Sequence, residues 1–440
     1  MIFVVSVPAT VTTRAETTDV KGLEAVFASR VSLSDCIRYA YDKNPAIQEA
    51  RRAWQATLER YRIDTGLPDP EIMVTYFPEP LETRLGPQDW NANISQKIPF
   101  PLKLSKAGEI VETEARIARL NLDKTVRDII VSIKESFYEL LYIRRARRVA
   151  DQNMKLLDHL RKVSETAYAR DRATLLDMVK AQSQTGQLRY DILLLEELEK
   201  TEIARLNGLL NRPPGAPIGR LQKETHRPLA FSLEEIYSQA KVNQEEIQIT
   251  KIQIKRAKKK VELARYHSLP DFKVGLFYAG IGNPDVASPA SDAGQDAIGI
   301  QAAVTLPLWF GKNKGRVAQA RAEMKKAEAA RALRINDTMT QIRALYFRMQ
   351  NAQRLVELYQ KELLPQAAKA MEIAETWFRQ GQSSFSDFIE TQSVWYNFNL
   401  ALARARADYG KNLARLERLV GRSLTARSDE SMNRSGKEEK

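Results

Sequence analysis

The stretch SLSDCIRYAYDKNPAI at residues 32–47 recurs 200 residues later as SLEEIYSQAKVNQEEI at residues 232–247. The order of the later landmarks is kept as well, because ATLLDMVKAQ at residues 173–182 corresponds to SSFSDFIETQ at residues 383–392. A repeat of this size indicates a duplicated domain rather than a solenoid of short repeats. The 440 residues therefore encode one structural unit twice.

The duplication sets the expected domain organisation. We divide the chain into an N-terminal segment (1–30), a first repeat (31–220), a second repeat (221–425) and a polar tail that we expect to be disordered (426–440). The N-terminal segment begins with an apolar patch followed by small residues and Thr-Arg-Ala, which resembles the remnant of a secretory signal peptide.

Each repeat is expected to contain a helix, two strands, a long helix and a returning helix. The first helix follows a serine at the N-cap position, Ser32 or Ser232. Apolar residues step by four and three along the first long helix, as in a coiled-coil seam: Val126, Ile130, Ile133, Phe137 and Leu140. The expected helical ranges are 33–64, 105–169 and 174–210 in the first repeat, and 233–266, 315–380 and 384–421 in the second.

The strands are expected from apolar residues that alternate with polar or small ones, clearest in Phe272, Val274, Leu276 and Tyr278. Period two predicts one apolar and one polar face. Loops rich in proline and glycine, 78–90 and 280–297, are expected to join the strands of each pair. Pro99, Pro101 and Pro307 mark the strand–helix junctions, because proline tolerates a strand end and a first helical turn.

Composition excludes several classes of protein. The chain is 43 % hydrophobic and 28 % charged, and no stretch reaches the roughly 18 uncharged apolar residues that a spanning helix needs. One cysteine excludes a disulfide framework, and three histidines far apart in sequence leave little material for a metal site. The net charge of +13 is interleaved with acidic residues along the chain, which argues against nucleic acid as a partner.

Sequence motifs for catalysis are missing as well. The chain has no glycine-rich phosphate or dinucleotide motif, no H-E-x-x-H and no C-x-x-C. Its many carboxylates show no spacing that marks an acid–base pair. We therefore predict no catalytic residues, no bound metal and no cofactor, and the protein is not expected to be an enzyme.

Four strands per chain cannot close a barrel, although each is near the length that crosses a bilayer obliquely. An open sheet in lipid would leave unpaired edges, so strands in a membrane must be closed by other copies. Two copies give eight strands with an interior filled by side chains, whereas three copies give twelve strands and room for a water-filled lumen. The strand count alone leaves both assemblies open. A soluble coiled-coil scaffold or adaptor with a small β insert is the alternative.

These motifs, in the same order twice, resemble the TolC family of outer-membrane efflux proteins. The similarity covers about residues 31–423 and rests on the doubled SL-x-(D/E) helix start, the proline-flanked strand pairs and the turn that precedes each returning helix. It implies a mainly helical chain whose four strands join a trimeric, 12-stranded β-barrel in outer-membrane lipid, with a long helical barrel in the periplasm. The stretch KIPFPLKLSKAGE at residues 97–109 is similar to the form in heavy-metal (CusC/CzcC-like) members.

The resemblance also implies a function and partners. The chain would be the exit duct of a tripartite efflux system, passively conducting substrates that an inner-membrane pump of the RND type delivers through a periplasmic adaptor protein. An exit channel for type I protein secretion is the alternative within the family. The sequence does not name the substrate or the pump.

Three carboxylates near the helical turns are the candidate pore residues. Asp387 and Glu390 are three residues apart and so share one face of the returning helix, and Asp177 is the first-repeat counterpart of Asp387. In the resembling family this face lines the pore constriction at the periplasmic tip. The alternative is a solvated helix start, where acidic residues are favoured by the helix dipole.

The turns themselves are expected at Asp171 and Arg172 in the first repeat and at Gly381 in the second. Glycine suits a left-handed turn conformation, and aspartate tolerates that conformation better than most residues. Family members that lock the closed tip through an arginine carry it just after the turn glycine. Here Ser383 stands at that place, so this lock is not expected in its usual form.

Overall fold

The computed structural model describes residues 24, 27–168, 175–222, 229–287, 291–380 and 382–425. The chain forms two compact units: a helical unit of residues 1–48, 126–237 and 341–440, and a sheet unit of residues 49–125 and 238–340. Each unit combines segments of both repeats. The apolar patch expected to be a signal remnant and the polar tail lie outside the described residues. No helix in the described ranges is both long and apolar enough to cross a bilayer.

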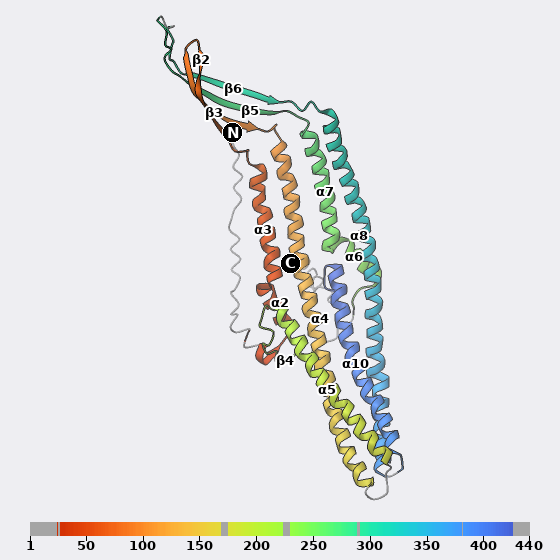
Figure 1. Cartoon of the computed structure of the whole chain (residues 1–440). Coiled ribbons are helices and arrows are strands. Elements are labelled where there is room, and N and C mark those ends of the chain that lie inside the picture. The colour runs from red at the N-terminus through yellow and green to blue at the C-terminus, as the bar shows by residue number, and fades with distance from the viewer. Residues whose placement is uncertain are drawn as a thin grey trace, which may run out of the picture. The chain divides into compact units, whose positions relative to one another are not determined.

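The sheet unit contains one antiparallel sheet of four strands (Figure 1). Its strands, in spatial order, are β2 (Glu71–Thr83), β3 (Gly86–Ile98), β5 (Asp271–Ile281) and β6 (Ala297–Thr305). The strand pair of the first repeat therefore lies beside the strand pair of the second. The predicted fold class, mainly helical with two strands from each repeat, is confirmed.

The prediction of a loop at residues 78–90 is wrong. The strands β2 and β3 continue through most of that range and are separated only by Arg84 and Leu85. Pro78 and Pro80 lie where the pairing register shifts between Tyr76 and Leu81, a bulge in which a missing backbone N–H costs little. The expected loop between β5 and β6 agrees with the structure, since the strands end at Ile281 and resume at Ala297.

Gly86 begins β3 with a φ of +134°, a conformation that L side chains rarely adopt. A Cβ atom at this position would lie 1.8 Å from the carbonyl oxygen of Gly282. The close approach is fixed by the neighbouring hydrogen bond, in which the Gly282 N–H donates to the Pro87 carbonyl at 2.7 Å. Glycine here lets the turn of the first strand pair pack against the end of β5.

Helices complete each unit. The sheet unit holds α7 (Glu245–Tyr266), most of α3 (Pro45–Thr65) and the first parts of α4 (Lys103–Tyr168) and α8 (Phe310–Leu358). The helical unit holds the remainder of α4 and α8 together with α2 (Leu33–Lys43), α5 (Leu175–Leu209), α9 (Leu364–Arg379) and α10 (Phe385–Val420). α6 (Leu233–Asn243) is shared between the two.

The core of the helical unit includes the predicted coiled-coil seam of α4. Ile133, Phe137 and Leu140 are fully buried and pack with Leu206 and Leu210. A short parallel pair that the sequence did not suggest, β1 (Arg30–Val31) with β4 (Arg220–Leu221), closes the same core. A second cluster gathers residues from α4, α5 and α10: Ala150, Leu157, Ala181, Leu188, Phe388 and Ile389.

The single helices expected at 33–64 and 233–266 are wrong, because each is two helices. The first breaks at Asn44, whose side-chain oxygen accepts from the backbone N–H of Ala46 at 2.9 Å and so caps α3. Pro45 follows as the first residue of α3, where its missing N–H is not needed. The second breaks at Gln244, whose side chain caps α7 by accepting from the Ile247 N–H at 2.8 Å.

The long helix expected at 315–380 begins earlier, at Phe310, and is interrupted. A π-helical turn, η1 (Tyr359–Leu363), separates α8 from α9. Pro365 stands in the first turn of α9, where it cannot supply an intrahelical N–H bond. The wider π-helical turn just before Pro365 makes room for the proline ring. Prolines commonly cause such bulges and kinks in helices.

Candidate functional site

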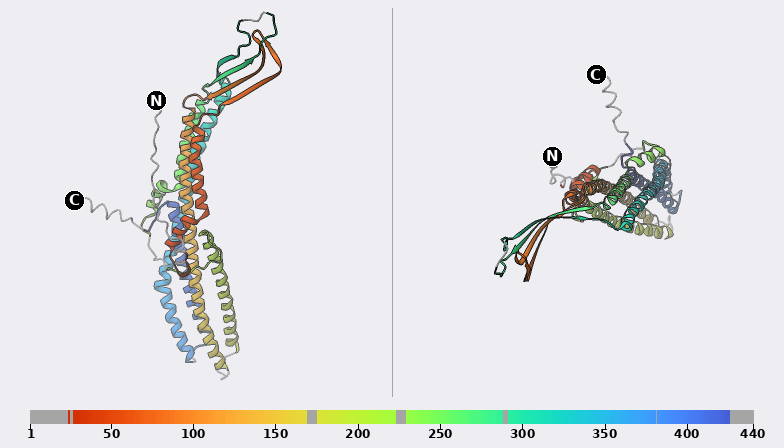
Figure 2. Two further views of the ribbon diagram at one scale, coloured as in Figure 1. Left: turned by 90° about the vertical axis from the view of Figure 1, so that its left-hand side faces the viewer. Right: turned by 90° about the horizontal axis from the view of Figure 1, so that it is seen from above.

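Figure 2 shows the four strands of the sheet from two further directions. The pairing register places apolar side chains on one face of this sheet and mostly polar or small side chains on the other. Strand register aligns one row of apolar side chains across all four strands: Ile72, Ile94, Leu276 and Ile300. Their exposed fractions are 72, 45, 56 and 85 %. Val74 and Ile298, in the next row, are 65 and 78 % exposed. A contiguous apolar face of this kind is unfavourable in water and needs a cover of lipid or protein.

The opposite face carries mostly polar and small side chains, with Met73 and Phe277 as two large apolar residues among them. Asn93 Nδ2 donates to Gln301 Oε1 at 2.7 Å, reaching across β5, where Gly275 leaves room. Lys273 Nζ lies 2.7 Å from Glu71 Oε2 on the same side of the sheet. Alternation of a lipid-compatible face with a hydrated face is the pattern of a transmembrane barrel strand.

Both edges of the sheet are open in one chain. β2 pairs only with β3 and β6 pairs only with β5 within the described residues. All three pairings are antiparallel, so β2 and β6 run in opposite directions. The β6 edge of one copy can therefore form an antiparallel pair with the β2 edge of the next. Open edges of this kind are ready templates for another strand.

The predicted junction prolines lie between strand and helix. Pro99 and Pro101 stand between β3 and α4, and Pro307 stands between β6 and α8. The carbonyl of Pro307 accepts from Asn313 Nδ2 at 3.1 Å, which ties the second junction to the first turn of α8.

The first junction is held by an ion pair that sequence reasoning missed. Lys103 Nζ lies 2.7 Å from Asp271 Oδ1 and also donates to the Leu269 carbonyl at 2.8 Å. Asp271 Oδ1 accepts the Phe100 N–H at 2.9 Å. The Lys103 side chain is 8 % exposed. This clamp joins the two repeats where their strands begin and end. The available sequence signal was Leu-Pro-Asp at residues 269–271, which also occurs at residues 67–69 of the first repeat.

The predicted acidic residues of α10 have different surroundings. The Asp387 carboxylate forms a capping box, since Oδ2 accepts from the Ser384 N–H at 3.1 Å and from the Ser384 hydroxyl at 2.7 Å. These hydrogen bonds, helped by the charge of Lys180, hold the pKa of Asp387 below its usual value. Glu390 is exposed one turn further on, on the side of α10 away from the buried Phe388.

The two helical hairpins approach each other beside this cap. Lys180 Nζ of α5 donates to the Ser386 hydroxyl of α10 at 2.9 Å. Asp177 lies in the first turn of α5, three residues before this lysine. The positively charged Lys180 therefore lies beside the Asp387 cap, which the spacing of the acidic residues does not predict. Asp171, Arg172 and Gly381 lie outside the described residues.

Across the ranges that the structure describes, no cluster of three or more His, Cys, Asp or Glu side chains could hold a metal ion. The single cysteine, Cys36, is buried in the helical unit, and burial raises its pKa to about 12.

Comparisons with known proteins agree with this arrangement. The sequence profile of the family described as Outer membrane efflux protein matches residues 236–422, most of the second repeat. No match was found among curated protein sequences. The predicted resemblance to outer-membrane efflux proteins is confirmed by the family match and by the shared fold.

Several solved structures share the fold of nearly the whole chain. The outer membrane protein VceC from Vibrio cholerae has a TM-score of 0.72 at 18 % identity, covering 89 % of this chain and 96 % of that one. The Neisseria gonorrhoeae MtrE outer membrane channel has a TM-score of 0.73 at 15 % identity, covering 89 % of both chains. CusC has a TM-score of 0.74 at 13 % identity, covering 89 % of this chain and 92 % of that one. The similarity of residues 97–109 to the heavy-metal form stays a prediction.

Proposed function

We propose that this chain, whose second repeat matches the outer membrane efflux protein family, is one subunit of a trimeric exit duct in the outer membrane. The observation that carries the proposal is the four-stranded sheet with two open edges, an exposed apolar face and a polar face. Three copies joined edge to edge would form a twelve-stranded barrel with a water-filled lumen. Lipid would cover the apolar face.

The duct would serve a tripartite efflux system. The helical barrel would stand in the periplasm and receive substrate from an inner-membrane pump of the RND type through a periplasmic adaptor protein. Conduction would be passive, because the polar face of the sheet would line a water-filled lumen and would carry out no chemical reaction. A type I secretion channel has the same fold, and the substrate is left open between a metal ion, a drug and a protein.

A soluble scaffold is disfavoured by the sheet. The exposed row of Ile72, Leu276 and Ile300 would face water in such a protein, which soluble monomers avoid over this extent. Outer-membrane fractionation with heat-modifiable electrophoretic migration separates the two functions. A protein that stays in the soluble fraction without detergent would be a scaffold and not a duct.

Within the duct, we assign the constriction to the acidic residues of the hairpin ends. Threefold symmetry would turn Asp387 and Glu390, joined by Asp177, into rings of carboxylates. Such rings favour cations and bind multivalent cations as blockers. Lys180 beside the Asp387 cap would reduce the field, so Glu390 would carry the larger share of the selectivity.

Planar bilayers test this assignment. The double variant Asp387→Asn and Glu390→Gln removes two charges per subunit and leaves Asn to accept the Ser384 hydrogen bonds, so α10 should remain capped. Cation selectivity should fall, and the concentration of hexamminecobalt(III) that blocks the channel should rise at least about tenfold, which corresponds to about 1.4 kcal/mol. The change should shrink near 1 M salt, where the screening length is about 3 Å.

The matched control is Asp42→Asn, which removes an exposed carboxylate of α2 in the same unit. It should conduct and be blocked as the unmodified channel is. If the double variant shows the same selectivity and block as this control, Asp387 and Glu390 do not line the pore. Asp387 would then be only a helix cap.

A further inference from the structure

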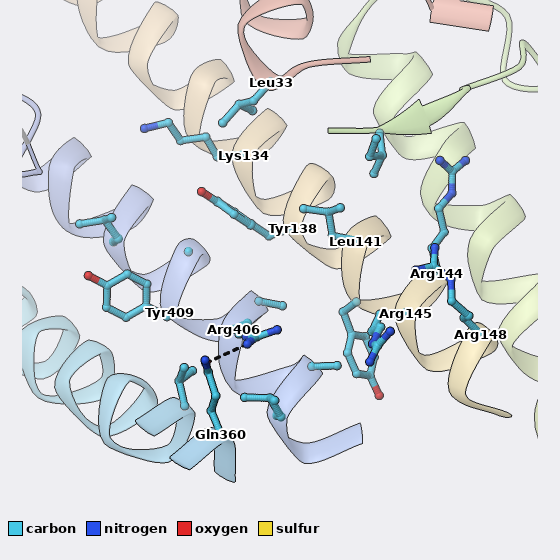
Figure 3. A pocket seen from close by; sticks show the side chains of 18 of the residues that line it. Leu33, Lys134, Tyr138, Leu141, Arg144, Arg145, Arg148, Gln360, Arg406 and Tyr409 are labelled. Carbon is cyan, nitrogen blue, oxygen red and sulfur yellow. Dashed lines mark hydrogen bonds between the residues drawn. The ribbon is translucent and has the colours of Figure 1, made fainter. Parts of the chain in front are cut away.

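A cavity of about 970 Å³ lies within the helical unit, between α4, α10 and the π-helical turn (Figure 3). Half-buried Leu141 of α4 and Leu402 of α10 supply apolar wall, and Tyr138 and Tyr142 lie beside them. A volume of this size fits a small organic molecule, and in such sites a few polar or charged groups among apolar walls fix the orientation of the ligand. The proposed function as an outer-membrane duct assigns no role to this cavity.

The cavity is strongly cationic. Glu417 is the one acidic residue among its lining residues. Six basic side chains line it: Lys134, Arg144, Arg145, Arg148, Arg220 and Arg406. Two of the six have partners, because Lys134 pairs with Glu417 at 2.6 Å and Arg144 pairs with Glu199 at 2.8 Å. Their charges are balanced within the fold.

The other four, Arg145, Arg148, Arg220 and Arg406, are not balanced in this way, since no described carboxylate forms an ion pair with any of them. Figure 3 shows Arg145 on α4 and Arg406 on α10 beside the same cavity. The Arg406 guanidinium donates to neutral Gln360 Oε1 at 2.8 Å. Arg406 is an exposed residue, but loss of part of its hydration and the positive charge of Arg145 lower the pKa of its guanidinium. Like charges brought together from two helices create a site that an anion would stabilise.

We propose that this cavity binds an organic anion, with its carboxylate held between Arg145 and Arg406 and its apolar body against Leu141 and Leu402. Guanidinium groups bind a carboxylate in two-point fashion, and their planar geometry makes that contact specific. Arg148 lies three residues after Arg145 on α4 and extends the positive surface by one turn. A second acidic group on the ligand would reach it.

The test uses the full-length protein in lipid nanodiscs and the probe 4-(trifluoromethyl)benzoate, followed by ¹⁹F NMR line broadening. The probe should bind, and added NaCl should weaken its binding by screening. The double variant Arg145→Gln and Arg406→Gln should raise the Kd about tenfold or more, because two charge-assisted contacts are lost. Arg406→Lys, which keeps the charge but loses the planar fork, should give an intermediate Kd.

Two controls make the result specific. Arg343→Gln removes an exposed arginine of the same unit outside the cavity and should leave the Kd unchanged. The cation 4-(trifluoromethyl)benzylammonium should not bind. Absence of benzoate binding to the unmodified protein would overturn the proposal, as would equal losses in Arg343→Gln and the double variant. A lower trimer stability of the double variant, without any benzoate binding, would show that a neighbouring copy supplies the anion and would also overturn it.

Discussion

Replacing Lys103 by Met should destabilise the sheet unit, because Lys103 is the centre of the clamp between the two repeats. Its ammonium lies 2.7 Å from Asp271 and 2.8 Å from the Leu269 carbonyl. Removing one partner of a buried ion pair costs about 3–5 kcal/mol. The side chains are 8 and 19 % exposed, so Asp271 keeps some contact with water. We therefore expect the lower end, a loss of about 3 kcal/mol per subunit.

The assay is guanidinium unfolding in detergent, followed by tryptophan fluorescence at one fixed protein concentration, because subunit association contributes to the stability of an oligomer. Lys97→Met is the matched control. Lys97 Nζ faces the other oxygen of the same aspartate, but at 3.8 Å and with a side chain that is 51 % exposed. Its loss should cost less than about 0.5 kcal/mol. A Lys103→Met protein no less stable than Lys97→Met would refute the clamp.

Two further substitutions and one labelling experiment probe the helical unit. Asn44→Ala should cost about 2 kcal/mol, because the cap of α3 and the hydrogen bond to the Leu209 carbonyl are both lost; an unchanged denaturation midpoint would contradict the assigned cap. Gly410→Ala should lower stability by about 1 kcal/mol despite the gain in helix propensity, since the new Cβ would lie 2.6 Å from the Tyr138 ring; a more stable variant would show that the ring moves freely. Burial raises the pKa of Cys36 from 9.0 to about 12, so at pH 8 its thiolate should be about a thousandfold scarcer in the folded protein than in the unfolded one. Thiol labelling should then follow unfolding, and prompt labelling of the native protein would show that the helical unit opens readily.

The sign of the Cys36 effect with pH follows from the direction of its shift. The folded thiol holds its proton more tightly than the unfolded thiol, whose ordinary pKa is 9.0. Its contribution to stability is fully present below pH 9 and declines as the pH rises toward 12. Alkaline conditions should therefore weaken the helical unit before they titrate the folded cysteine.

Much of the fold was predictable because the sequence repeats. The seam at Ile133, Phe137 and Leu140 identified α4, and alternation in β5 identified the sheet. The sequence contains a signal for the break at Asn44, because a capping residue is followed by proline. The apolar pattern continues through this position, however, and so predicts one uninterrupted helix. The sequence predicts a loop at Pro78, where the structure has a bulge. Proline is common in loops and in bulges, and only pairing with a neighbouring strand distinguishes the two.

The candidate site was less predictable, for a physical reason. Spacing within a helix shows which residues share a face but not what that face meets. Asp387 and Glu390 do lie on an exposed side of α10, but the proximity of Lys180 depends on how two hairpins from different repeats pack. The pairing of Lys103 with Asp271 and the cavity that Arg145 and Arg406 both line likewise bring together segments more than 150 residues apart in sequence.

The most direct test of the trimeric duct is the mass of the purified protein, combined with its conductance. Native mass spectrometry of the detergent-solubilised protein should give the mass of three chains, and the same preparation should form ion-conducting channels in planar bilayers. Three chains are the smallest closed assembly whose strands leave a water-filled lumen. A monomer with folded strands, or a two-chain assembly that does not conduct, would contradict the account.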